Sequence, residues 1–102
     1  MPNIAAAIVL AASLMGVPVP QGAYPSVVEV RQSTVDAFCY LKSYKCAAVF
    51  LPISNGKIYT AYPHNAELLA HEACHWIQWR RGERYSEKYS EPRCKDVQRR
   101  AR

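Results

Sequence analysis

The 102-residue sequence has no internal repeat, no low-complexity segment and few acidic residues, 8 against 13 Lys and Arg. The first two absences exclude a repeat protein and a pair of units joined by a flexible linker. A long transmembrane span is also missing, because the uncharged apolar stretch 4–19 is interrupted by Gly16 and Pro18 and is too short to cross a bilayer comfortably. The length leaves room for a single domain.

The apolar stretch near the N-terminus suits the hydrophobic region of a secretory signal. No Lys or Arg precedes it, and the small residues Gly22 and Ala23 favour cleavage near that point. We therefore predict residues 1–23 as a signal peptide or apolar leader, and 24–102 as a domain exported to the periplasm or secreted. An uncleaved membrane anchor and a buried N-terminal helix are the alternatives.

The run His71-Glu72-Ala73-Cys74-His75 carries the strongest chemical signal in the chain. On a helix, two histidines four positions apart differ by about 40° around the axis and roughly 6 Å along it, so both rings can reach one metal ion. Glu72 then lies beside the metal and can act as a general base on zinc-activated water. The alternative is a buried helix whose histidines are satisfied by hydrogen bonds.

These residues resemble the gluzincin metallopeptidases, in which a second helix supplies a glutamate as the third zinc ligand. In related small members the second motif reads Glu-x-x-Ala-Asp, and the nearest match here is the segment 91–95, Glu-Pro-Arg-Cys-Lys. The resemblance implies Glu91 as the third ligand, with Glu87 as its rival. Lys95 replaces the aspartate expected to orient His71, and Asp96 follows one residue late.

Four cysteines allow three pairings, and an even count in a short exported chain suggests disulfides. A bridge between Cys74 and Cys94 would pin together the two helices that carry the ligands, and Cys39 would then pair with Cys46. The competing interpretation makes Cys74 or Cys94 a zinc ligand or a free core thiol. It is less favoured because Cys74 precedes His75 by one residue and points away from the metal face.

The pattern of the remaining chain predicts a small α+β domain. Asn-Gly between the apolar runs 47–53 and 57–62 indicates a β-hairpin, and Pro52 places its first strand at an edge or a bulge. Residues 26–30 are either a short strand or the start of a helix, and a further helix begins near residue 33, with Phe38 and Leu41 as its apolar face. Asn65 is a good cap for the zinc helix, which Gly82 ends.

Two further features bear on substrates and partners. Tyr85 and Tyr89 are candidate donors to the oxyanion of a transition state, although packing is the more common role of a tyrosine. Residues 80–102 hold nine basic side chains against four acidic ones, so an anionic surface is a candidate partner and a solvated helix face is the alternative. No nucleic acid is expected as a partner of an exported chain.

Together these patterns predict a zinc metallopeptidase that hydrolyses peptide bonds in peptides, proteins or peptidoglycan. A zinc- and disulfide-stabilised binding module without turnover is the first alternative. A basic structural protein whose motif is accidental is the second.

Overall fold

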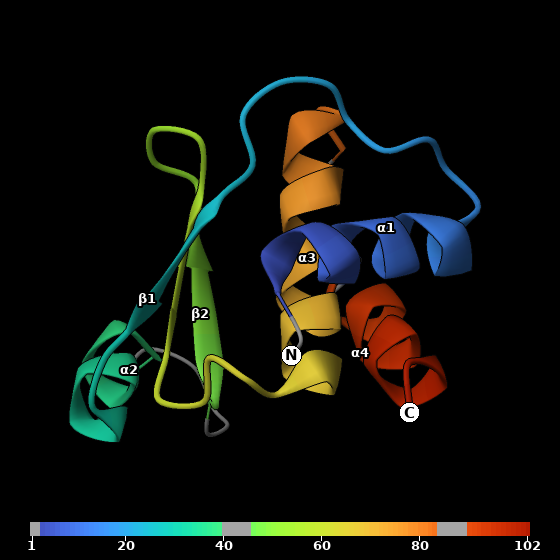
Figure 1. Ribbon diagram of the computed structural model, residues 1–102. Coiled ribbons are helices and arrows are strands. Elements are labelled where there is room, and N and C mark those ends of the chain that lie inside the picture. Colours follow the sequence, from blue (N-terminus) through green and yellow to red (C-terminus); the bar gives the residue numbers. More distant parts are fainter. Residues whose placement is uncertain (1–2, 40–45, 84–89) are drawn as a thin grey trace.

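The computed structural model describes residues 3–39, 46–83 and 90–102, and within these ranges it has four helices and one three-stranded sheet (Figure 1). The elements follow in the order α1 (Ile4–Met15), β1 (Ser26–Glu29), α2 (Gln32–Cys39), β2 (Ala48–Leu51), β3 (Lys57–Thr60), α3 (Ala66–Arg80) and α4 (Ser90–Arg100). The predicted α+β class is confirmed.

The sheet has the strand order β1-β3-β2. Strands β2 and β3 pair antiparallel across the predicted Asn-Gly turn, and β1 joins the other side of β3 in parallel. The predicted hairpin is therefore confirmed, and β2, which Pro52 follows directly, is an outer strand as expected. Of the two predictions for residues 26–30, a strand or the start of a helix, the strand is confirmed.

Alternating side chains of the sheet pack against helices on its two faces. Phe50 and Ile58 belong to the core that includes α3, whereas Val49 packs with Val35 of α2. The apolar face expected for α2 is partly wrong, since Val35 is buried while Phe38 is 46 % exposed and stacks on Tyr59. Leu41 lies outside the described residues.

Helix α3 lies at the centre of the molecule, between the sheet on one side and α1 and α4 on the other (Figure 1). It begins as predicted at Asn65, whose side chain accepts a hydrogen bond from the backbone nitrogen of Leu68 at 3.0 Å. It ends before Gly82, which has a φ of 69°. All residues from 68 to 78 are buried, so the helix that carries the predicted zinc motif is held on every side.

The predicted leader forms α1, and this helix packs across α3 and α4 (Figure 1). Ile8 and Ala11 of α1 are fully buried in the main core. Arginines of α4 reach its C-terminal end, where Arg93 donates to the carbonyl of Met15 at 3.1 Å and Arg100 to that of Leu14 at 3.2 Å. Removal of residues 1–23 remains a prediction. Among the described helices, none is long and apolar enough to cross a bilayer.

Both predicted disulfides are confirmed. Cys39 bonds to Cys46, which closes the region between α2 and β2, and Cys74 bonds to Cys94, which joins α3 to α4. Two disulfides in so short a chain suggest an oxidising environment outside the cytosol.

Candidate metal centre

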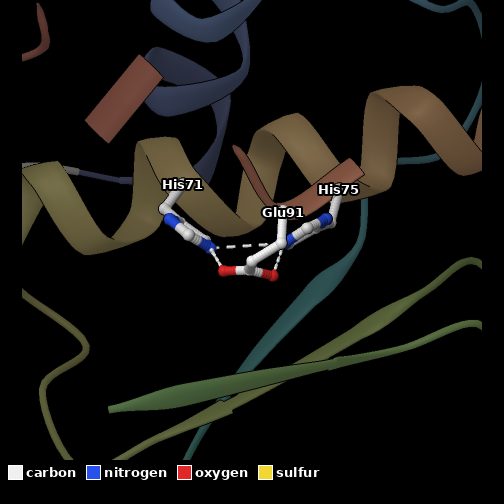
Figure 2. A group of neighbouring side chains, drawn as sticks. All are labelled: His71, His75 and Glu91. Carbon is white, nitrogen blue, oxygen red and sulfur yellow. Dashed lines mark hydrogen bonds and ion pairs between the residues drawn. The ribbon is translucent and has the colours of Figure 1, made fainter. Parts of the chain in front are cut away.

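Helix α3 presents His71 and His75 on the same face, one turn apart (Figure 2). The two Nε2 atoms lie only 3.2 Å from each other, and the two side chains are 9 % and 5 % exposed. This convergence is what the four-residue spacing predicts. Because the flanking residues Ala70, Ala73 and Ile77 are buried in the core, the helix has little freedom to rotate these rings out of the site.

Glu91 reaches the same point from the first turn of α4 (Figure 2). Pro92 follows it within that turn, where a proline is tolerated because the nitrogen lacks an intrahelical partner in any case. The disulfide of Cys94 fixes this end of α4 to α3, and an ion pair of 3.0 Å between Arg102 and Glu67 links the other end of α4 to the start of α3. The carboxylate is thus held by contacts at both ends of its helix.

The carboxylate of Glu91 bridges the two histidines. Its Oε1 lies 2.8 Å from Nε2 of His71 and its Oε2 lies 2.9 Å from Nε2 of His75. These contacts shift the pKa values of the site. Burial alone would raise the pKa of Glu91, but the hydrogen bonds from both histidines outweigh it and hold that pKa well below the ordinary 4.5.

The pKa of His71 moves in the opposite direction. Burial alone would lower it, but the hydrogen bond to Glu91 and the negative charges of Glu72 and Glu91 outweigh burial, so the pKa lies above the ordinary 6.5. The two neighbouring carboxylates therefore stabilise a positive charge on the ring of His71. A metal cation at the same point would supply that charge in place of the proton.

Glu72 lies next to this group without joining it. Its side chain is buried, and Oε2 is 3.9 Å from Nε2 of His71. This carboxylate is therefore close to the point where the other three residues could hold a small molecule or an ion, although it is not one of the three residues whose ligand atoms converge.

Two glutamines that the sequence motifs do not single out also lie near the histidines. Gln78 lies 3.3 Å through its Oε1 from Nδ1 of His75. Nδ1 of His71 has no well-formed hydrogen bond within the described residues, and Gln98 of α4 acts weakly on that ring by raising its pKa. Spacing in the sequence could have indicated both glutamines. Gln78 follows His75 by three residues and Gln98 follows Glu91 by seven, so each glutamine lies on the same helix face as a predicted zinc ligand.

The positions around the expected aspartate take other roles. Lys95 is exposed on α4, and Asp96 forms ion pairs with Arg99 and with Arg100. Neither supplies a carboxylate to His71 in this structure. The rival ligand Glu87 and the candidate donors Tyr85 and Tyr89 lie outside the described residues.

The structure thus brings together three of the predicted site residues, His71, His75 and Glu91, whose candidate ligand atoms all lie within 4.8 Å of one another. Two imidazole nitrogens and a carboxylate oxygen are donors that a transition metal accepts, and the donor set suits Zn²⁺. The lone pairs of these nitrogen and oxygen atoms converge on one point, where they could coordinate a cation. This group can therefore hold a metal ion.

Comparison of the chain with protein-family models, with curated proteins and with solved structures finds no match.

Proposed function

We propose that the chain is an exported zinc metallopeptidase, with His71, His75 and Glu91 as the zinc ligands and Glu72 as the general base. One observation carries the proposal: two histidine nitrogens and a glutamate oxygen converge within 4.8 Å, with a second buried carboxylate 3.9 Å from one of those nitrogens. Structural zinc sites are almost always closed by four protein ligands, whereas catalytic sites have three and keep a position for water; among the described residues three candidate ligands converge here.

Zinc bound by two histidines and a glutamate acts as a Lewis acid and lowers the pKa of water to about 7. The role of Glu72 is then to accept the proton of the attacking water at a carboxylate oxygen. It next passes this proton to the nitrogen of the leaving amine.

The sheet offers a way to bind an extended peptide. Strand β2 is an outer strand of the order β1-β3-β2 and packs against α3, the helix that carries both histidines. The backbone of a substrate can add to such an edge as a further strand, which would align its peptide bonds beside the histidines. Peptides, protein segments and peptide cross-links of peptidoglycan all provide an extended backbone of this kind.

The basic C-terminal segment gives weaker support for an anionic partner. Arg93 and Arg100 bond to carbonyls of α1, while Arg99 and Arg102 pair with Asp96 and Glu67. These contacts use much of the positive charge within the molecule itself.

The decisive experiment compares Glu72→Gln with the wild type on panels of peptides, unfolded proteins and peptidoglycan fragments. The variant keeps its shape and its zinc but loses the proton acceptor, so hydrolysis should fall by on the order of a hundredfold or more. Glu29→Gln is the matched control, because it makes the same change at an exposed glutamate of β1. A zinc-loaded wild type that cleaves nothing in these panels would favour the binding-module alternative.

A further inference from the structure

Gln78 holds the most buried polar amide next to the histidines. This residue is 2 % exposed, it follows His75 by three residues on α3, and its Oε1 lies 3.3 Å from Nδ1 of that ring. An amide oxygen can only accept a hydrogen bond. The contact therefore requires a proton on Nδ1 of His75.

Glu91 acts on the other nitrogen of the same ring. Its Oε2 lies 2.9 Å from Nε2 of His75, and a carboxylate is also only an acceptor. In the neutral ring a single proton is available, so Gln78 favours the Nδ1–H tautomer and Glu91 favours the Nε2–H tautomer. A metal ion binds the nitrogen that has no proton. The tautomer that Gln78 selects is the one that leaves Nε2 available to a metal.

The amide of Gln78 also packs against the disulfide. Sγ of Cys94 lies 3.3 Å from its Oε1, so the oxygen is enclosed between the ring of His75 and the bond that joins α3 to α4. The orientation of this amide is therefore coupled to the same covalent link that holds Glu91 at the site.

We infer that Gln78 is the positioning residue of His75: its amide oxygen keeps the proton on Nδ1 and presents Nε2 as a metal ligand. This inference rests on the proposed metal site. A neutral amide replaces the carboxylate or backbone carbonyl that more often orients a ligating histidine.

The test separates the orientation of the ring from metal binding. In the metal-free Glu91→Ala variant, which lacks the competing carboxylate, at about pH 8, where an ordinary imidazole is neutral, nitrogen-15 NMR of the histidine rings should show a protonated Nδ1 and an unprotonated Nε2 for His75. Adding Gln78→Met to this variant keeps the volume but removes the acceptor of the Nδ1 proton, and the proton should move toward Nε2. An Nδ1 without a proton in the Glu91→Ala protein would overturn the inference, whether or not zinc binds to the wild type.

Zinc titration gives the second readout. Gln78→Met should weaken zinc affinity by roughly 10- to 100-fold, as loss of such a partner typically does, and Gln78→Glu, which retains an acceptor, should restore most of it. Gln32→Met is the control, because that glutamine bonds to the carbonyl of Cys46 and to Asp36 on α2. Equal zinc affinity in the Gln78→Met and Gln32→Met proteins would contradict the inference. Absence of zinc binding in the wild type would instead reject the proposed function, while the tautomer of His75 still decides the role of Gln78.

Discussion

Cys74 and Cys94 are joined by a disulfide that lies between the ligand-bearing segments of α3 and α4. Cys74 directly precedes His75, and Cys94 follows Glu91 by three residues. Helix α4 contributes Val97 and Cys94 to the core and otherwise carries mostly polar and charged side chains. The disulfide is therefore a covalent constraint on the distance between Glu91 and the histidines.

Loss of this disulfide should weaken the metal site. In the double variant Cys74→Ser and Cys94→Ser, we expect the free energy of unfolding to fall by about 3 kcal/mol for a loop of this size and zinc affinity to fall with it. The double variant Cys39→Ser and Cys46→Ser is the control, since that bond joins α2 to the start of the hairpin. Titration of both variants with zinc checks this, and equal affinities would show that the bond near Glu91 does not support the site.

The metal-free protein should lose stability as pH rises above neutrality. The pKa of His71 is raised above 6.5, so its contribution is complete below about 6.5 and disappears as pH rises through the raised value. The pKa of Glu91 is lowered from 4.5, so its contribution is complete above about 4.5 and disappears as pH falls through the lowered value. The pair therefore stabilises the metal-free fold most between these two values.

Urea unfolding with a chelator present, at about pH 5.5 and about pH 8, measures this difference. The Glu91→Gln variant should have a flatter pH dependence, because its side chain no longer carries the charge that holds the proton on His71. Zinc should reverse the trend, since it binds the deprotonated ring. A metal-free wild type that gains stability over this pH range would contradict the assignment of the charges.

Sequence patterns predicted the elements that depend on local chemistry. The Asn65 cap, the stop at Gly82, the Asn-Gly hairpin and the two histidines on one face all follow from spacing and turn residues, and each is found in the structure. The packing of the helices against one another could not be predicted from the sequence in the same way. An uncharged apolar helix such as α1 has the composition of a leader, and only tertiary contacts show that it also fills the face of α3.

The local part of the site could also be predicted from the sequence, but its tertiary contacts could not. The spacing of His71, Glu72 and His75 is local, whereas the approach of Glu91 depends on how α4 crosses α3. Gln78 escaped notice because its role depends on the direction of one amide oxygen. No motif encodes that direction, and the nearby disulfide sulfur contributes to it.

Helix α1 should contribute substantially to the stability of the full chain. Ile8 is fully buried among α3 and α4 side chains, so Ile8→Ala should lower the free energy of unfolding by about 2–4 kcal/mol. Its neighbour Val9 is 56 % exposed, and Val9→Ala should cost no more than about 0.5 kcal/mol. Denaturant unfolding of the full-length variants measures both. Equal and small effects would show that α1 is not part of the folded core in solution.

Gly56 lets the hairpin pack closely against α3, because it has no side chain. It has a φ of +97°, and a Cβ at this position would lie 2.7 Å from Cδ1 of Trp76, whose Nε1 donates to the carbonyl of Asn55 at 2.8 Å. Gly56→Ala should therefore cost about 2 kcal/mol or more and should alter the fluorescence of Trp76. Gly16→Ala is the control, because it also has a positive φ but no atom within 4 Å of the added Cβ. A smaller loss at Gly56 than at Gly16 would contradict the described packing.

The zinc content of the purified wild type and of three single variants decides whether His71, His75 and Glu91 form a zinc site. Elemental analysis should find one zinc per wild-type chain and a large loss of zinc from His71→Ala, His75→Ala and Glu91→Ala, since each change removes one of three protein ligands. The Glu72→Gln protein should keep its zinc. Near-stoichiometric zinc in all three ligand variants, or no zinc in a folded and oxidised wild type, would contradict the account.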